Sequence, residues 1–389
     1  MVVELLDLLL GGIEEELPFA LTLRKRLHAN PEPSHMERGT ARLVAEALAD
    51  EETRSVAGNG LLARTGPSGS GAVVVRAELD ALPLTEETGA PFASTNGMMH
   101  ACGHDVHMAA LAAFFRAARR LDGLLPAPLV ALYQPSEEAY PSGADLVVRE
   151  GVLEGETAAV VAAHVHPGLP WGAVSVEAGA VNASSDNLRI VVEGEGGHGA
   201  YPHRARDPIL ALSHVLVALQ SVVSRRLDPM HPGVLSVGWL RSGSAENVIP
   251  GRAEAGATLR VLAPEDRRPL REAALEIAEH TARAHGCAVW VEVTEGEPAT
   301  VNDPAFAAAA RSLLPKAGLA LGPPMRSCGS DDFGFYGRVA PSLMAFVGLE
   351  GAPDSPQAAL HHPRFLPPEE AVGLVARTQA VAYVAAASA

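Results

Sequence analysis

Three short apolar runs, each followed by polar residues, constrain the fold of this chain more than any other feature. They are GAVVVRAEL (71–79), APLVALYQ (127–134) and AAVVAAHV (158–165), and each is typical of a buried strand. Helical patterns accompany them at about 13–29, at 37–50 and from Asp105 to about Arg120. Strands that are apolar throughout are covered on both faces, so their alternation with helices predicts an α/β sheet with helices on both sides.

The middle of the chain follows a different pattern, in the order β-α-β-β-α-β. Strands are predicted at 186–196, 233–243, 251–263 and 287–296, and helices at 207–225 and 264–286. The first of these helices has Asp207 as its N-cap and Pro208 at its first position. This order is the ferredoxin-like signature. The mixed pattern then returns, with a helix at 303–314, a strand at 342–349 and a helix at 368–386.

Together these patterns predict an α/β fold in two parts. A discontinuous domain with a mixed sheet would comprise residues 1–181 and 298–389, and a ferredoxin-like α+β domain would be inserted over 182–297. A chain of 389 residues is long enough for two domains of ordinary size.

Composition excludes several classes of function. The formal net charge of −16 argues against a nucleic-acid binder and offers no basic surface to an anionic membrane. No run of about 18 apolar residues occurs, so no membrane span is predicted. The three cysteines, Cys102, Cys287 and Cys328, form neither a CxxC pair nor an even disulfide framework, which predicts a cytoplasmic protein.

The stretch MMHACGHDVHMAAL (98–111) concentrates side chains that bind metals. Cys102 and His104 are two residues apart in a glycine-containing loop, where side chains at this spacing point the same way and can reach one ion. Thiolate, imidazole and carboxylate ligands suit zinc, manganese or cobalt. His100 and His107 are either structural or supporting residues, and direct metal ligation by His107 stays open.

Polar residues also stand at the carboxyl ends of the three predicted strands, where ligands bind in open α/β sheets. They are Glu78 and Asp80, Glu137 and Glu138, and His164 and His166, and a late loop adds His361 and His362. Two adjacent buried carboxylates repel each other unless a cation lies nearby. One of Glu137 and Glu138 can therefore bind a metal while the other takes a proton from water, as metal-assisted hydrolysis requires. The alternative is a solvated loop with two exposed acids.

Cys102 has a rival role as a nucleophile, because a single cysteine with histidines nearby fits that chemistry. No one histidine is singled out as its base, however, and carboxylates surround it in the predicted site. A thiolate that bridges two cations accounts better for the surplus of ligands.

Six motifs in a fixed order resemble the M20 family of metallo-amidohydrolases and peptidases. They are HACGHDVH, QPSEE, GEGGHGAYPH, NVIPG, GSDDFGF and LHHP, and the resemblance extends over almost the whole chain. It is strongest to the branch of N-acyl-amino-acid amidohydrolases, hippurate hydrolases and auxin-conjugate hydrolases. The resemblance implies a catalytic domain interrupted by a lid domain that serves dimerisation.

The resemblance also implies two divalent ions per chain, Mn²⁺, Zn²⁺ or Co²⁺, and a role for each matching residue. The implied ligands are Cys102, which would bridge the ions, and His104, Glu138, His164 and His361. Glu137 would act as general base and acid, and His198 would stabilise the oxyanion from a partner subunit, which implies a homodimer or higher homo-oligomer. Asn247, and Arg260 with less support, would face the substrate carboxylate.

The sequence therefore predicts metal-dependent hydrolysis of the amide bond of N-acyl amino acids. An exopeptidase or dipeptidase of the same superfamily and a metal-binding protein without catalysis are the alternatives. Three features depart from the family: Glu78 replaces a usual Asp, EEAYPSGA replaces a glycine-rich segment, and NASSD (182–186) replaces a more common Met-Ala-Ser. His361 is preferred to the adjacent His362 because it directly follows Leu360.

Overall fold

The chain divides into two compact units. The computed structural model describes all residues except 1, 49–52, 70, 354 and 356, so the predicted end of the helix 37–50 lies outside the described residues. The first unit comprises Met1–Gly179, Val301–Met325 and Phe335–Ala389, and the second comprises Ala180–Thr300 and Arg326–Gly334. The predicted insertion was 182–297. The segment 326–334 joins the second unit in addition, where the backbone N–H of Ala183 lies within hydrogen-bonding distance of two of its carbonyls, those of Ser327 and Gly329.

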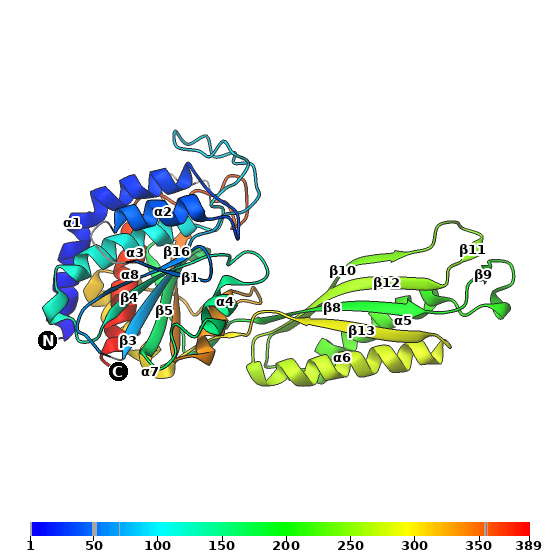
Figure 1. The fold of residues 1–389 in the computed structure, drawn as a ribbon. Coiled ribbons are helices and arrows are strands. Elements are labelled where there is room, and N and C mark those ends of the chain that lie inside the picture. Colours follow the sequence, from blue (N-terminus) through cyan, green and yellow to red (C-terminus); the bar gives the residue numbers. More distant parts are fainter. Residues whose placement is uncertain (1, 49–52, 70, 354, 356) are drawn as a thin grey trace. The chain divides into compact units, whose positions relative to one another are not determined.

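The first unit contains an eight-stranded mixed sheet (Figure 1). Across the sheet the strands are β1 (Arg54–Val56), β2 (Gly60–Thr65), β4 (Leu129–Gln134), β3 (Ala72–Glu78), β5 (Thr157–Pro170), β16 (Ser342–Glu350), β6 (Ala173–Ser175) and β15 (Ala320–Leu321). The central strands β4, β3, β5 and β16 are parallel, whereas β2 and β6 pair with their central neighbours in the antiparallel sense. The predicted α/β fold with a mixed sheet is therefore confirmed.

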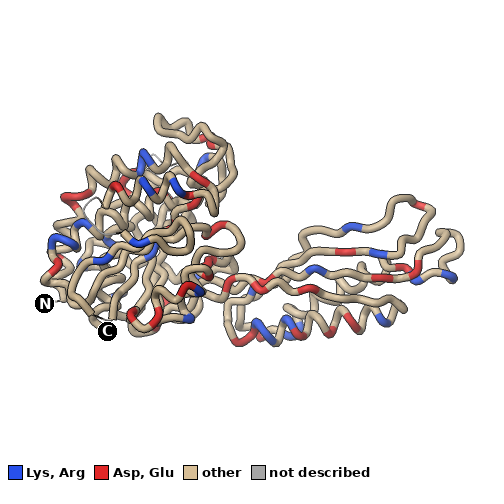
Figure 2. The backbone as a smooth tube through the Cα atoms, viewed as in Figure 1, with Lys and Arg blue, Asp and Glu red and all other residues tan. Residues whose placement is uncertain are grey.

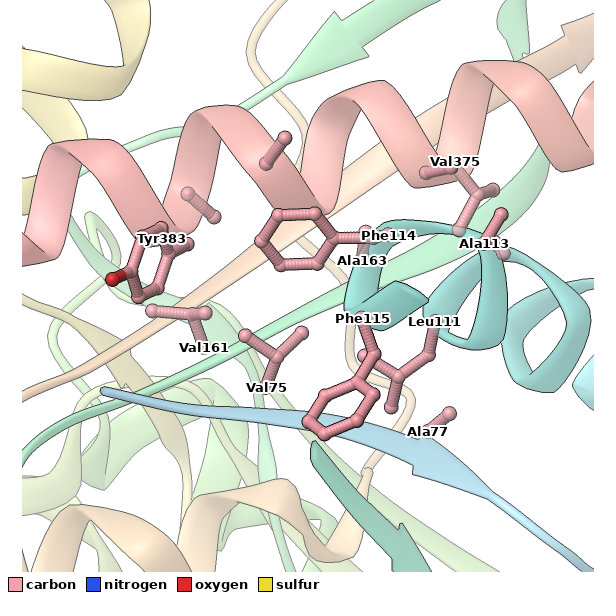
Figure 3. Close-up of a cluster of buried hydrophobic side chains, with 14 of the residues drawn as sticks. Val75, Ala77, Leu111, Ala113, Phe114, Phe115, Val161, Ala163, Val375 and Tyr383 are labelled. Carbon is pink, nitrogen blue, oxygen red and sulfur yellow. The ribbon is translucent and has the colours of Figure 1, made fainter. Parts of the chain in front are cut away.

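Most helices of the first unit share the hydrophobic core of this sheet. The helices are α1 (Val2–His28), α2 (Arg38–Ala47), α3 (His104–Arg119), α4 (Gly143–Arg149), α7 (Pro304–Leu313) and α8 (Ala371–Ala387). Figure 3 shows Phe114 and Phe115 of α3 between α8 and the strands β3 and β5. Both rings are fully buried, and burial of a phenylalanine contributes about 1.5–3 kcal/mol. This core fixes α3, and thereby the residues at its N-terminus, against the sheet.

Helix α1 begins at Val2, whereas the sequence predicted a helix from about residue 13. The extra turns carry Leu5, Leu6 and Leu9, which are buried in the core of the first unit. An apolar N-terminal run interrupted by Asp7 is thus one face of an amphipathic helix.

The second unit has the element order β-α-β-β-α-β. Its elements are β8 (Ser184–Glu193), α5 (Pro208–Ser221) with a π turn at Val222–Arg226, β10 (Gly233–Ser242), β12 (Arg252–Val261), α6 (Pro264–Ala284) and β13 (Ala288–Glu295). The sheet order is β10-β12-β8-β13, antiparallel throughout, and residues of α5 and α6 form a separate core with it. A short pair, β9 (Gly197–His198) with β11 (Val248–Ile249), extends from it. The chain crosses between the units within β7 (Gly179–Asn182) and β14 (Thr300–Asn302).

Candidate active site

Five segments of the first unit bring their polar residues together at one edge of its sheet. These segments are the end of β3, the loop before α3, the loop after β4, the middle of β5 and the loop before α8. Three overlapping groups of possible ligand atoms result, each with all its atoms within 4.8 Å of one another: Glu78, His104, His107 and His164; Cys102, Glu138 and His361; and His104, Glu137 and Glu138. The predicted convergence at the carboxyl ends of parallel strands is thus what the structure shows.

Gly103 sets the geometry between Cys102 and His104. It is the N-cap of α3, with a φ of 85°, so the chain turns there through the left-handed region. A Cβ atom at this position would lie 2.5 Å from Cγ2 of Val165. Only glycine fits both conditions, and the turn delivers Cys102 and His104 to the same buried site.

His104 presents one ring nitrogen to the site. Its Nδ1 is 2.8 Å from the backbone carbonyl oxygen of Asp80, whereas its Nε2 makes no hydrogen bond and lies 3.8 Å from Oε2 of Glu137. Burial alone would lower the pKa of His104, but the side-chain carboxylate of Asp80 and the charge of Glu78 raise it to about 10. Without a cation the ring therefore carries a proton, and a bound cation would take the place of that proton.

His164 and Cys102 face each other, with 3.5 Å between Nε2 and Sγ. The Nδ1–H of His164 donates to the carbonyl oxygen of Val165 at 2.7 Å, which leaves the Nε2 lone pair directed at the cluster. Burial, together with the nearby His107, holds the pKa of His164 well below its usual value. The neutral ring that results is the form that binds metals.

Glu138 and His361 form the second side of the cluster. The backbone N–H of Glu138 donates to Oδ2 of Asp80 at 2.9 Å, and its Oε1 is 3.2 Å from Nε2 of His361. His361 has a φ of 61°, and its N–H donates to the carbonyl of Ala101. The adjacent His362 instead accepts the N–H of Arg364 in its own turn. The structure thus places His361, and not His362, at the site.

A left-handed Ser136 turns the loop after β4 so that Glu137 and Glu138 both reach the cluster. Ser136 has a φ of 53°, and Glu37, which is fully buried, accepts its N–H at 2.8 Å and its hydroxyl at 3.0 Å. Glu137 approaches His104 while Glu138 approaches His361, so the two neighbouring carboxylates diverge as expected. No local sequence pattern marks Glu37, which is 99 residues from Ser136.

The three other histidines near the motif do not present a lone pair to the cluster. His107 uses both ring nitrogens, one with Glu78 and the other with the N–H of Val165. His100 is fully buried, neither of its nitrogens makes a hydrogen bond, and burial lowers its pKa to about 4. His166 accepts the N–H of Gly168.

A buried ion network lies beneath the first turn of α3. Oδ2 of Asp105 accepts the Nε–H of Arg24 at 2.9 Å and is 3.0 Å from Nδ1 of His28, whose Nε2 is 3.0 Å from Glu86. Burial would lower the pKa of His28, but Asp105 and Glu86 raise it to about 9. The network ties α1 to the turn that carries His104.

We expect His28 to make stability depend on pH. Its pKa is raised in the folded protein, so its contribution is complete below pH 6.5 and is lost as the pH rises through about 9. The rise corresponds to about 3 kcal/mol. In urea unfolding of the metal-free protein, the difference in free energy between wild type and His28→Gln should shrink from pH 6.5 to pH 9. A difference that stays constant over this range would contradict the assignment.

Three residues predicted to contact the substrate, His198, Asn247 and Arg260, lie in the second unit. His198 of β9 pairs with Val248 of β11, and the N–H of Gly199 donates to the carbonyl of Asn247, so His198 and Asn247 are neighbours. Arg260 lies toward the far end of β12 and donates to the hydroxyl of Ser330. It lies eight positions along β12 from Arg252, about 26 Å, and the start of β12 is the end that follows Asn247 and β11. Within one chain, Asn247 and Arg260 are therefore not brought to the same anion.

The residues of the cluster fit divalent metal ions. Two buried atoms of the cluster make no hydrogen bond with any described residue: Nε2 of His104 and Oε1 of Glu138. Buried polar atoms of this kind normally have partners. One thiol, imidazoles and carboxylates within a few ångströms of one another form a donor set suited to zinc, manganese or cobalt.

Comparison with known proteins places this geometry among hydrolases. Residues 74–383 match the model of Peptidase family M20/M25/M40. N-acetyl-L-cysteine deacetylase of Bacillus subtilis (strain 168) is 34% identical over 93% of this chain and 86% of its own length. IAA-amino acid hydrolase ILR1-like 4 of Arabidopsis thaliana is 34% identical over 90% of this chain and 81% of its own. The crystal structure of Bacillus subtilis YXEP, described as a dinuclear metal binding peptidase from the M20 family, has a TM-score of 0.84 at 29% identity and covers 95% of this chain and 98% of its own.

Proposed function

Since the chain belongs to Peptidase family M20/M25/M40, we propose that it hydrolyses the amide bond of N-acyl amino acids with the help of two divalent ions. The family resemblance seen in the sequence is confirmed, and so is the prediction of an amide hydrolase. The observation that carries the proposal is the position of Glu137. Its Oε2 lies 3.8 Å from Nε2 of His104, while two of the three groups of possible ligands form without it.

The chain supplies a separate group for each task of hydrolysis. We assign Cys102, His104, Glu138, His164 and His361 to metal binding, and the sulfur of Cys102 faces both His164 and the group that contains Glu138 and His361. Bound divalent ions would polarise the amide carbonyl and make water a stronger nucleophile at neutral pH. Glu137 would take a proton from that water and deliver it to the leaving amine. Zinc, manganese and cobalt remain equal candidates for the metal.

Relatives of this chain support an N-acyl amino acid as the substrate. Two of them are described as a deacetylase of an N-acetylated amino acid and a hydrolase of an IAA-amino acid conjugate. An exopeptidase or dipeptidase is the second candidate, because the family also contains peptidases. The two differ in whether the enzyme cleaves free dipeptides in preference to acyl amino acids.

Chelation tests the proposal directly. Hydrolysis of N-acetyl-, N-benzoyl- and indoleacetyl-amino acids should be lost on chelation and recover when Mn²⁺, Co²⁺ or Zn²⁺ is added back, with about two ions bound per chain. Activity that is indifferent to chelation but lost on alkylation would favour Cys102 as a nucleophile. Two bound ions without hydrolysis of any acyl amino acid or dipeptide would favour a metal-binding protein.

We propose further that the second unit forms a homodimer. Strand β10 is an edge strand, and its exposed residues include Trp239 and Leu240. The neighbouring α5 contains no charged residue, and its exposed residues include Leu210 and Val217. Figure 2 shows charged residues of both signs along α6, as expected for a helix that faces solvent, in contrast to α5. An exposed edge strand beside an apolar helix face suits a self-complementary contact between two copies.

The positions of Asn247 and Arg260 add to this proposal. If both face one substrate carboxylate, they must come from different copies, because Arg260 lies about 26 Å along β12 from Arg252, the end of the strand that follows the Asn247 segment. His198 would then reach a site from the same copy as Asn247, since the two are neighbours.

Helix α5 with its π turn, Pro208–Arg226, is also long and apolar enough to cross a membrane by length and composition alone. One such helix is weak evidence for a span. Its buried face belongs to the core of the second unit, so we assign its exposed apolar face to the dimer. We propose a cytoplasmic location from the three free cysteines.

Replacement of Val217 by Glu is expected to convert the dimer to a monomer. The side chain is 73% exposed, so the change should not disturb the core, but it would place a charge in the interface. Light scattering with size-exclusion chromatography measures the result. Leu124→Glu, at a 61% exposed position of the first unit, is the control and should leave the mass unchanged. A wild-type monomer, or a Val217→Glu dimer, would contradict this interface.

A further inference from the structure

His107 lies beside the metal cluster but has no lone pair to give to a metal. Its Nδ1 is 2.9 Å from Oε2 of Glu78, and its Nε2 is 3.1 Å from the backbone nitrogen of Val165. A backbone N–H can only donate, so Nε2 accepts it and the ring proton lies on Nδ1, facing Glu78. Both nitrogens of His107 are therefore occupied by the protein itself.

The hydrogen bond to Val165 acts on the strand segment that carries His164. Strand β3 pairs with β5 as far as Arg76 opposite Ala162, and within the described register the pairing stops there. The ring of His107 bonds to β5 three residues further on, beyond the end of the ladder with β3, on the side of β5 opposite its continuing ladder with β16. The rings of His107 and His164 also lie 4.5 Å apart between centroids. A displacement of His107 would thus remove one contact to the backbone beside His164 and one contact to its ring.

His107 is itself held by a buried chain of polar groups. Glu78 accepts from His107 through Oε2 and pairs with Arg76 through Oε1, and both charged side chains are buried. Nε of Arg76 donates to Oε1 of Gln134 at 2.9 Å, and the hydroxyl of Tyr336 donates to the same oxygen at 2.8 Å. Burial would raise the pKa of Glu78, but Arg76 and His107 hold it well below its usual range. Glu78 is therefore an ionised anchor with each of its two oxygens committed.

We propose that Glu78 and His107 are positioning residues, which hold His164 and its backbone in the orientation for metal binding without binding metal themselves. The inference rests on the proposed function only in taking His164 as a ligand. It also accounts for the glutamate at position 78, where the family resemblance implies an aspartate. An aspartate is one methylene shorter, so we expect it to weaken at least one of the contacts that Glu78 makes with Arg76 and His107.

Titration of Co²⁺ into the metal-free protein tests this role. His107→Ala should bind as many ions as the wild type, with affinity reduced about 10- to 100-fold, because it removes a support and not a ligand. His107→Gln can place an amide oxygen near the position of Nε2, where it accepts the Val165 N–H. His107→Asn places its amide near Nδ1 and keeps only the contact with Glu78. Binding by His107→Gln should therefore be closer to the wild type than binding by His107→Asn.

The visible spectrum of the Co²⁺ protein supplies a second readout. Glu78→Asp should alter the ligand-field bands, because His164 would be less well oriented, while the number of bound ions stays the same. Loss of one ion in all three His107 variants would identify His107 as a ligand and overturn the proposal. Unchanged affinity in His107→Ala would overturn it too. Thermal unfolding of each metal-free variant identifies any protein that has not folded. If the His107 variants do not fold, the ligand-field bands of Glu78→Asp decide whether the two residues position His164.

The outcomes separate this inference from the proposed function. If the wild type binds no metal, the proposed function fails before His107 is tested. If the wild type binds two ions but hydrolyses none of the acyl amino acids, the proposed function fails in favour of a peptidase or a metal-binding protein, and the titrations still decide the role of His107.

Discussion

Glu137→Gln should abolish hydrolysis while the protein still binds its full number of metal ions. The amide keeps the size of the side chain but cannot take a proton from water, and loss of a general base costs about 10²- to 10⁴-fold. We expect kcat for an N-acyl amino acid to fall by at least about 10²-fold, with the metal content of the purified protein unchanged. Steady-state kinetics and metal analysis of the same preparation measure both quantities.

The adjacent residue is the matched control for this experiment. Oε1 of Glu138 is buried, makes no hydrogen bond and lies 3.2 Å from Nε2 of His361, so Glu138→Gln should weaken metal binding. Its activity should recover in part with excess metal, whereas that of Glu137→Gln should not. Equal loss of metal in the two variants would show that Glu137 is a ligand. Full activity of Glu137→Gln would remove it from catalysis.

The sequence predicted the place of this site because two independent patterns agree there. Continuous apolar runs identified β3, β4 and β5, and polar residues followed each run. Parallel strands bring such residues to one edge of a sheet whatever their separation along the chain. The convergence of Glu78, Glu138 and His164 therefore needed no knowledge of side-chain contacts.

The sequence could not decide which side chains bind metal where that choice depends on hydrogen bonds between residues distant in the chain. Spacing alone could not exclude His107 as a ligand, because its hydrogen bonds go to Glu78 and Val165, which are 29 and 58 residues away. The choice between His361 and His362 likewise depended on one left-handed residue. Glu37, which holds the loop of the two carboxylates, has no local pattern that marks it. The short elements α4 and β15 were not predicted, because a few residues are too short a stretch to show a periodic pattern.

Gly103→Ala is expected to remove metal binding and with it activity. An alanine at this left-handed position costs about 1–2 kcal/mol, and its Cβ would also lie 2.5 Å from Val165, which adds about 1–3 kcal/mol of overpacking strain. Relief of that clash shifts Val165 of β5 or the turn before α3, and these segments carry or adjoin His164, Cys102 and His104. We expect Co²⁺ affinity to fall at least about 100-fold, beyond the effect of a lost supporting residue.

Gly97 provides the control that separates backbone strain from the clash. Its φ is 81°, close to that of Gly103, but no atom lies within 4 Å of the Cβ that an alanine would add. Gly97→Ala should thus show only the cost of the left-handed conformation and bind Co²⁺ as the wild type does. If both variants lose stability equally and both keep their metal, the close approach of Gly103 to Val165 does not govern the site. A selective loss in Gly103→Ala would show that the spacing of Cys102 and His104 depends on a position where no side chain fits.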